Sequence, residues 1–411
     1  MSKPKLRFKA DNGSVYPEWK KNTLGDIGTF MKGASLSKAD ISETGTPFIL
    51  YGELYTTYGE VAYDIKRKTQ ADVDPKYYSV PGDVVIPTSG ESPEEISTAT
   101  CVMTPGVILA GDLNIYRTDK VDGRIVSYLM NHQIKNDIAR IAQGKSVVHI
   151  QAKNLEKLMV CYPESLEEQE KIASFFADLD EVIQTSEAEV AALEKQKKGA
   201  MQKIFSQEVR FKMDDGSDYP EWTEDTLANI SERLLVGLAT TVTPYYRETG
   251  VPMFRNLNIK AGYLDCSDML YLDEKYASKQ SGKTVNAGDI LTVHTGNIGW
   301  SAVVPKEYDG ALTFTTLITT VNSTIVNNGY VTAYLNSPFG MKGMKDLAFS
   351  GGRANLNVKE FEKLIVPIPC LEEQQKIADF LSDFDTAIDL AKQELEKWKL
   401  LKKGLMQQMF V

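Results

Sequence analysis

Two stretches of the chain place apolar residues at alternating steps of four and three, with polar and charged residues between them. Alternating threes and fours are the pattern of a coiled-coil seam, a narrow apolar stripe that packs against a partner helix. The pattern predicts two helices of about 40 residues, each roughly 60 Å long at 1.5 Å per residue. The large residues of the two predicted seams are Ile172, Phe176, Leu179, Ile183, Val190 and Leu193, and then Ile377, Leu381, Phe384, Ile388, Leu395 and Trp398.

Start signals precede both helices. Pro163 stands before a Ser165-x-x-Glu168 capping box, and Pro367 and Pro369 prevent a helix from beginning before Leu371. Two arrangements remain open at this point. The two seams pack against each other, or each helix lies separately on its own domain; the regularity of the heptads favours the pair.

Both helices belong to an internal repeat. The phrase RFKADNGSVYPEWKKNTLGDI begins at Arg7 and returns from Arg210 as RFKMDDGSDYPEWTEDTLANI, with 13 of 21 positions identical at an offset of 203. LEEQEKIASFFADLDEVIQ, from Leu166, returns as LEEQQKIADFLSDFDTAID from Leu371, at an offset of 205. The order is phrase, globular segment, helix, twice over. If the helices are antiparallel, the end of the chain lies near its beginning, and the molecule has a pseudo-twofold axis.

The globular segments, residues 28–153 and 231–359, contain short β-branched and aromatic runs between Gly and Pro, which indicate strands. PGDVVIPTSG, from Pro81, aligns with AGDILTVHTG, from Ala287, at an offset of 206. Elsewhere the two segments diverge, so the frame is duplicated and the loops are not. The fold class expected is α+β, with two β-rich domains and two long antiparallel helices. If the loops bind something, the two domains bind different versions of it.

The charge of the chain is uneven. The net charge of 411 residues is −10, but residues 164–208 and 371–411 together carry −8 of it, so the acidic balance does not exclude nucleic acid for the globular segments. The four cysteines lie far apart, no apolar run reaches the roughly 18 residues of a membrane helix, and no signal peptide is visible. These features predict a cytoplasmic protein with no membrane segment.

Catalytic motifs are missing from the sequence. QGKSVV and SGKTV, which begin at Gln143 and Ser281, lack the first glycine of a phosphate-binding loop. The three histidines lie far apart, and no carboxylate or cysteine is near them at metal-ligand spacing. No nucleophile constellation and no metal site are found, so the sequence predicts a binding protein.

Three motifs then indicate a family. L-E-E-Q-x-K-I-A-x-F occurs twice, each copy after L-x-x-L-x-V-P or its variant LEKLMVCYP, and is accompanied by two GD(V/I)(V/L) strands and two KKGxMQxxF endings. Over essentially its whole length the chain resembles the specificity (S, HsdS) subunits of type I restriction–modification systems. One departure is Cys161-Tyr162-Pro163, where the second copy has Pro367-Ile368-Pro369.

The resemblance implies a DNA reader without catalytic residues. It implies a first target recognition domain in residues 1–163, a first conserved spacer helix in 164–206, a second recognition domain in 207–368 and a second spacer helix in 369–411. Each domain would read one half of an asymmetric, bipartite site in double-stranded DNA. The helices would set the distance between half-sites and bind two methyltransferase (M) subunits, which restriction (R) subunits join. S-adenosylmethionine, ATP and Mg²⁺ are then expected on the partners, with no cofactor in this chain.

Candidate DNA-binding residues are polar or basic side chains on loops, because such side chains read base edges and phosphates. For each of them the alternative is an ordinary solvated side chain. The candidates are Tyr51, Lys66, Arg67, Lys68, Ser89 and Lys145 in the first domain, and Arg255, Asn256, His294, Asn297 and Arg353 in the second.

Two other classes of function compete with this reading. The first is a scaffold of two interaction domains held apart by a coiled coil, which neither binds DNA nor needs a methyltransferase. The second is a fused restriction enzyme, which the lack of cofactor motifs argues against. Trp19 and Trp222, in the repeated phrase, are expected to pack a domain against a helix rather than to stack on bases.

Overall fold

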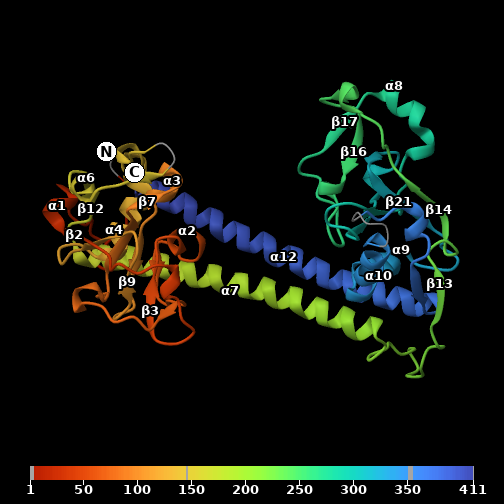
Figure 1. The fold of residues 1–411 in the computed structure, drawn as a ribbon, viewed down its shortest axis with the longest axis horizontal. Coiled ribbons are helices and arrows are strands. Elements are labelled where there is room, and N and C mark those ends of the chain that lie inside the picture. The colour runs from red at the N-terminus through yellow and green to blue at the C-terminus, as the bar shows by residue number, and fades with distance from the viewer. Residues whose placement is uncertain (1–3, 145–146, 350–354, 411) are drawn as a thin grey trace. The chain divides into compact units, whose positions relative to one another are not determined.

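The computed structural model describes residues 4–144, 147–349 and 355–410. It contains two compact units. Unit 1 is Met1–Ser186 together with Glu394–Val411, and unit 2 is Glu187–Gln393. Each unit therefore contains one globular segment and part of each long helix. The mixed helix and strand content confirms the α+β fold class (Figure 1).

The centre of unit 1 is a five-stranded sheet in the order β2 (Thr29–Lys32), β10 (Leu113–Arg117), β6 (Asp83–Pro87), β8 (Thr100–Val102) and β4 (Val61–Ala62). A three-stranded sheet is formed by β5 (Lys68–Thr69), β3 (Thr46–Ile49) and β9 (Ile108–Leu109), and two-stranded pairs join β1 (Lys20–Thr23) to β12 (Met159–Tyr162) and β7 (Ser89–Gly90) to β11 (Val148–His149). The short helices are α1 (Leu24–Ile27), α2 (Glu53–Thr56), α3 (Pro93–Ile96), α4 (Gly123–Tyr128), α5 (Lys135–Ile141) and α6 (Ala152–Leu155).

Unit 2 repeats the order of the first four strands of the central sheet of unit 1. One four-stranded sheet has the order β14 (Ser231–Val236), β21 (Thr316–Val321), β18 (Ile290–Val293) and β19 (Ser301–Val303), and another has β15 (Tyr246–Arg247), β17 (Leu270–Leu272), β16 (Val251–Arg255) and β20 (Leu312–Phe314). β13 (Thr223–Thr226) pairs with β22 (Ile365–Ile368), as β1 pairs with β12. Its helices are α8 (Glu274–Ala277), α9 (Asn328–Asn336), α10 (Pro338–Phe349) and α11 (Val358–Phe361). The strands and helices expected in both globular segments are confirmed.

Two long helices, α7 (Leu166–Phe205) and α12 (Leu371–Met409), have 40 and 39 residues. In unit 1 the rings of Phe176 and Phe410 lie 6.3 Å apart, and Asp180 Oδ1 lies 2.7 Å from Lys402 Nζ. The residue number rises along α7 while it falls along α12, so this pair is antiparallel.

Unit 2 has the same antiparallel pairing in its own part of the helices. Lys197 Nζ lies 2.5 Å from Asp385 Oδ1, and Glu194 Oε1 lies 2.7 Å from Lys392 Nζ. The predicted pairing is confirmed in both units, and every predicted seam residue is buried or half-buried. The seam does more than join the helices, because Ile172 and Phe176 are also part of the core of unit 1, as Ile377 and Leu381 are of unit 2.

The chain also closes on itself, as the repeat predicted. Backbone N–H groups of Lys5 and Leu6 donate to the carbonyl oxygen of Gln408, at 2.8 and 3.3 Å. Trp19, Tyr128 and Phe176 surround Phe410, which is almost fully buried. The last turns of α12 therefore complete the core of unit 1.

The repeated phrase docks the start of each long helix. In unit 1, Arg7 donates to both carboxylate oxygens of the buried Glu168 at 2.9 and 2.8 Å, and Trp19 Nε1 donates to the same carboxylate at 3.3 Å. In unit 2, the carboxylate of Glu373 accepts from Arg210 at 2.9 Å and from Trp222 at 2.9 Å. Both tryptophans hold a helix start, which confirms their expected structural role and explains why the phrase occurs twice.

The glutamine of the LEEQ motif has an equally defined place. Gln169 Oε1 accepts from the Asp122 N–H at 2.7 Å, and its amide nitrogen donates to the Pro163 carbonyl at 2.8 Å. Gln374 makes the same pair of bonds with the Asn327 N–H, at 2.7 Å, and the Pro369 carbonyl, at 2.8 Å. Buried polar groups need such partners, so the motif joins each helix to the loop before α4 or α9.

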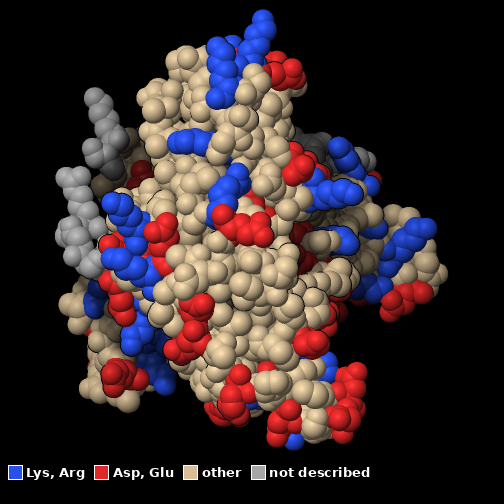
Figure 2. Space-filling view, turned by 90° about the vertical axis from the view of Figure 1, so that its right-hand side faces the viewer, with Lys and Arg blue, Asp and Glu red and all other residues tan. Residues whose placement is uncertain are grey.

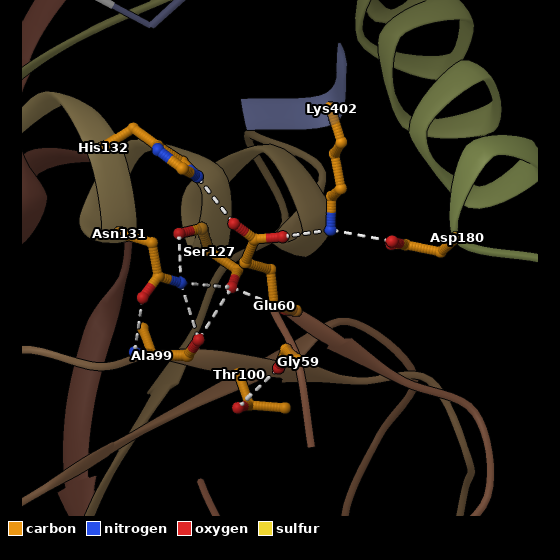
Figure 3. A network of polar contacts seen from close by, with 9 residues as sticks. All are labelled: Gly59, Glu60, Ala99, Thr100, Ser127, Asn131, His132, Asp180 and Lys402. Atoms are coloured by element: carbon orange, nitrogen blue, oxygen red, sulfur yellow. Dashed lines mark hydrogen bonds and ion pairs between the residues drawn. The ribbon is translucent and has the colours of Figure 1, made fainter. Parts of the chain in front are cut away.

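A buried ionic network secures the end of α12 in unit 1 (Figure 3). Lys402 Nζ lies 2.5 Å from Glu60 Oε2 and 2.7 Å from Asp180 Oδ1, and Glu60 Oε1 lies 2.6 Å from His132 Nε2. The three side chains of Lys402, Glu60 and Asp180 are 17%, 18% and 26% exposed. Lys402 on α12 thus joins this helix to α7 and to the β-rich part of unit 1.

Candidate nucleic-acid interface

The turn that follows β3 in unit 1 has the same hydrogen bonding as the turn that follows β16 in unit 2. In unit 1 the Glu53 carboxylate accepts from the Leu50 N–H at 3.0 Å, just after β3, and in unit 2 the Asn258 amide oxygen accepts from the Arg255 N–H at 2.9 Å, just after β16. β3 pairs in parallel with β9 as β16 does with β20. These matches align Tyr51 with Asn256.

In unit 1, polar side chains lie close together next to the ends of β3, β6 and β10. Ser89, which follows β6, donates to Asp112 Oδ2, just before β10, at 3.1 Å. His149 on β11 pairs with Ser89 on β7. Tyr51 lines the same cleft as Ser89 and Asp112, and the volume of this cleft is about 980 Å³. Tyr51, Ser89, Asp112 and His149 are called the first polar cluster.

The cleft of the first polar cluster is rich in carboxylates. Glu53 already has structural partners, because it accepts from the Leu50 N–H and lies 3.2 Å from the Arg67 guanidinium. Glu91 and Glu95 line the cleft beside Tyr55. Burial raises the pKa of the Tyr55 phenol, and its hydroxyl has no hydrogen-bond partner among the described residues. A ligand in this cleft would meet carboxylate and phenol groups together with two basic side chains, Lys38 and Arg67.

The same place in unit 2 is formed by neutral side chains. The amide of Asn256, after β16, donates to Thr295 Oγ1 at 3.0 Å, and its oxygen lies 3.2 Å from Thr316 Oγ1, at the start of β21. His294 Nδ1 lies 2.8 Å from Asn355 Oδ1. Asn256, His294, Thr295, Thr316 and Asn355 are called the second polar cluster.

Asn355 orients the ring of His294, whose Nδ1 lies 2.8 Å from Asn355 Oδ1. Which of these groups donates depends on the tautomer of the ring and on the orientation of the amide. The other ring nitrogen, Nε2, is buried without a partner among the described residues. Backbone bonding fixes the loop, since the Leu356 N–H donates to the His294 carbonyl at 3.0 Å.

The predicted DNA-binding residues fall into three groups. Tyr51 and Ser89 belong to the first polar cluster, and Asn256 and His294 to the second. Arg67 lines the cleft of the first cluster, and Asn297 is exposed on the turn that follows His294. The others lie outside both clusters: Lys66 is exposed and paired with Asp64, Lys68 is exposed on β5, Arg255 donates to Asp268, and Lys145 and Arg353 are outside the described residues.

Residues that the sequence reasoning missed complete both clusters. They are Asp112 and His149 in unit 1, and Thr295, Thr316 and Asn355 in unit 2. The offset of 206 carries Ser89 onto Thr295 and His149 onto Asn355. Extending the repeat alignment into the loops would therefore have found two of the five.

Figure 2 shows one face of the molecule, on which Lys and Arg side chains alternate with Asp and Glu. No single basic field covers this face. Such a mixed surface attracts phosphates weakly, because phosphate neutralisation requires a local excess of positive charge. In the part of the chain that the structure describes, no helix is long and apolar enough to cross a membrane.

Fold and clusters together define a class: an internally duplicated α+β protein that presents two different polar clusters at one position of a repeated frame. The two units share the docking of the long helices and the order of the central strands, and they differ in the side chains at the ends of their loops. The chain belongs to the family of the type I restriction modification DNA specificity domain, whose model matches residues 16–195 and 239–399.

Curated relatives and solved structures agree with the family. The chain is 25% identical over 418 residues to a putative type I restriction enzyme specificity subunit, MjaX, of Methanocaldococcus jannaschii, covering 97% of this chain and 94% of the relative. It is 25% identical over 274 residues to the MjaVIII specificity subunit of the same organism, with 64% of each chain covered. The fold is similar to the crystal structure of a type I S subunit from M. genitalium, with a TM-score of 0.64, 14% identity, and 100% and 99% of the two chains covered.

Proposed function

We propose that this chain is the DNA specificity subunit of a type I restriction–modification complex. Each unit reads one half of a bipartite, asymmetric site, and the two polar clusters contact the bases. The carrying observation is that one frame holds Tyr51, Ser89 and Asp112 in one copy and Asn256, Thr295 and Thr316 in the other. Different donors and acceptors at one position recognise different base edges.

The scaffold alternative accounts less well for these clusters. Protein–protein interfaces are typically centred on buried aromatic or apolar side chains, whereas these loop ends carry hydroxyl, amide, imidazole and carboxylate groups. Such groups read base edges by hydrogen bonds, and their neighbours contact the backbone. The membership of the family supports the DNA reader in the same direction.

Two methyltransferase subunits and the restriction subunits complete this proposed assembly. The chemistry is theirs, with S-adenosylmethionine on the methyltransferase and ATP and Mg²⁺ on the partners. This chain supplies recognition and is not itself catalytic. The duplicated frame supports two copies of the methyltransferase, because each unit repeats the same helix start and the same docking phrase.

The test is co-expression with the neighbouring methyltransferase gene, followed by single-molecule sequencing of methylated host DNA. We expect one methylated motif with two different short halves and a fixed gap. Exchange of one globular segment for that of another family member should change one half of the motif only. A stable complex that methylates nothing, and that binds no DNA sequence preferentially, would contradict the proposal and favour the scaffold.

A second test concerns the chain alone. Outside residues 164–208 and 371–411 its net charge is only −2, so these near-neutral segments should bind duplex DNA weakly until the methyltransferases add positive surface. Fluorescence anisotropy with a labelled duplex that contains the motif measures both states at the same moderate salt concentration. Tight, sequence-specific binding by the isolated chain would refute the claim that the methyltransferases supply the positive surface needed for affinity.

A further inference from the structure

The amide of Asn256 is held from both sides by hydroxyl groups. Its nitrogen lies 3.0 Å from Thr295 Oγ1 and its oxygen lies 3.2 Å from Thr316 Oγ1. The two threonines come from different segments, one after β18 and one at the start of β21. A side chain at the end of β16 is thereby fixed in one plane, although it remains partly exposed.

The hydrogen bonds that remain available do not depend on which way the amide faces. Each threonine hydroxyl can donate or accept, and Thr316 also has the Phe314 carbonyl within reach at 3.1 Å. If the amide is turned over, Thr295 donates to its oxygen and Thr316 accepts from its nitrogen. In both orientations one N–H and one oxygen lone pair are left for a ligand.

One donor beside one acceptor matches a single base in the major groove. Adenine presents the N7 acceptor next to the N6 amino donor, guanine presents two acceptors, and cytosine presents a donor without that acceptor. Asparagine bound to adenine N6 and N7 uses one N–H and one oxygen lone pair, the number that the two threonines leave free. A fixed amide discriminates better than a free one, because less conformational freedom is lost on binding.

The backbone next to this amide is strained. Thr315, immediately before Thr316, has φ of +50°, in the left-handed region that a β-branched residue rarely adopts. Its N–H donates to the Leu238 carbonyl at 2.8 Å, which holds the turn in place. Strain of this kind is concentrated at functional sites, where the surrounding structure stabilises it.

At the matching position the first unit has a phenol instead of an amide. Tyr51 occupies the position of Asn256, and the hydrogen bond between Ser89 and Asp112 joins the other two segment ends. A phenol and a carboxylate offer a different pattern from an amide, so the two halves of the DNA site are read by different chemistry.

We infer that Asn256 specifies an adenine in the half-site read by unit 2, through its remaining N–H and lone pair. Thr295 and Thr316 are positioning residues that hold the amide in plane. This inference rests on the proposed function and adds to it a named base and a named residue.

The experiment compares Asn256→Asp with the unchanged chain, each in complex with the methyltransferase. Aspartate keeps the shape and removes the donor, so the contact with adenine N7 is lost. A second variant, Asn256→Ser, removes the amide without adding charge. Asn322→Asp is the matched charge control: it lies beyond the opposite end of β21, and its oxygen only accepts, from the Thr324 N–H at 3.0 Å and the Thr324 hydroxyl at 2.7 Å. Thermal melting and complex formation check that every variant folds.

The readout is the methylated motif, together with competition binding by duplexes that carry each base at each position of the second half. Both Asn256 variants should lose roughly 10- to 100-fold of the preference for adenine at one position, in line with the worth of one bidentate contact. The first half, the gap and the Asn322→Asp motif should stay unchanged. A half-site without adenine, or an unaltered second half in both Asn256 variants, would overturn the inference, whereas the absence of any motif in the unchanged complex would overturn the proposed function instead.

Discussion

Substitution of Lys402 by methionine should destabilise unit 1 far more than its buried area suggests. Lys402 is 17% exposed and is the cation that faces both Glu60, at 2.5 Å, and Asp180, at 2.7 Å. Methionine keeps the apolar stem and removes the charge, so two mostly buried carboxylates lose their common partner. Removing one member of a buried ion pair costs about 3–5 kcal/mol, and the partial exposure of this network places the expected loss near about 3 kcal/mol.

The pKa of Glu60 reports how strongly the whole network, His132 as well as Lys402, favours the ionised carboxylate. Burial by itself would raise this pKa, but the hydrogen bond with His132 and the charge of Lys402 outweigh it and lower the pKa from 4.5 to about 2. At about 1.4 kcal/mol per pH unit, this difference is worth about 3 kcal/mol of folding free energy. Because the folded pKa is the lower one, this stability is present above pH 4.5 and is lost as the pH falls toward 2.

Acid titration of the Lys402→Met variant therefore has a defined expectation. Without the cation, the pKa of Glu60 moves back up, and the loss of stability between pH 4.5 and 2 becomes shallower than in the unchanged chain. Asp180 acts in the opposite sense, because burial raises its pKa against the pull of Lys402. The ionised Asp180 thus costs stability above its own titration range, and that cost increases in the variant.

Lys197 provides the matched control. It occupies the corresponding position of α7, 205 residues earlier, and contacts Asp385 at 2.5 Å. The Asp385 side chain is 45% exposed, so Lys197→Met leaves a carboxylate that water can solvate. We expect a loss of about 1 kcal/mol or less there.

Urea unfolding of the full chain, followed by tryptophan fluorescence, measures both losses. Hydrogen exchange then assigns each loss to a unit, through peptides from α4 for unit 1 and from α9 for unit 2. In a unit of this size about 3 kcal/mol corresponds to a melting temperature lower by roughly 6–12 °C. Equal losses in the two variants, or less than about 1 kcal/mol for Lys402→Met, would refute the reasoning, since Glu60 and Asp180 would then be solvated without their partner.

Two further predictions concern stability elsewhere. Thr315→Asn should stabilise unit 2 by about 1 kcal/mol, because asparagine tolerates the left-handed region better than a β-branched residue; a lower urea midpoint would contradict this. Glu168→Gln should cost about 2–3 kcal/mol, because the buried carboxylate bonds Arg7 and Trp19 and charged hydrogen bonds are worth more than neutral ones. Glu167→Gln, on the same turn, keeps an amide oxygen that can accept from the Tyr16 hydroxyl and should cost less than about 1 kcal/mol in the same unfolding assay, so comparable costs for the two would count against the docking role of Glu168.

The long helices and the duplication could be predicted from the sequence because both are local or periodic signals. A 3-4 spacing repeated along some 40 residues has one structural solution, and two copies of a phrase need only alignment. The structural role of the LEEQ motif could not be predicted in the same way. The sequence predicts Glu168 as a capping-box residue and assigns no role to Gln169, whereas their burial depends on Arg7 and on the loop at Asp122, which are distant in sequence.

The polar clusters were predictable in part for a similar reason. Ser89 and His294 end strands that the GD motif marks, so their position was visible. Asp112 and Thr316 come together with them only through the order of strands in a sheet, which no local pattern states. Lys66 and Lys68 were chosen for their charge, and the structure places them outside the cleft.

Comparison of the two copies within this one chain distinguishes residues that both units share from residues that differ between them. The residues that hold the start of each long helix are the same in both copies, as with Glu168 and Glu373 or Gln169 and Gln374. Asn256 occupies the place of Tyr51, and both face outward from the same segment end. The backbone around these two positions keeps the same hydrogen bond in both units, from the N–H of Leu50 or Arg255 to the side chain three residues later. Under the proposed function, the phenol of one unit and the amide of the other let one frame read two half-sites of different chemistry.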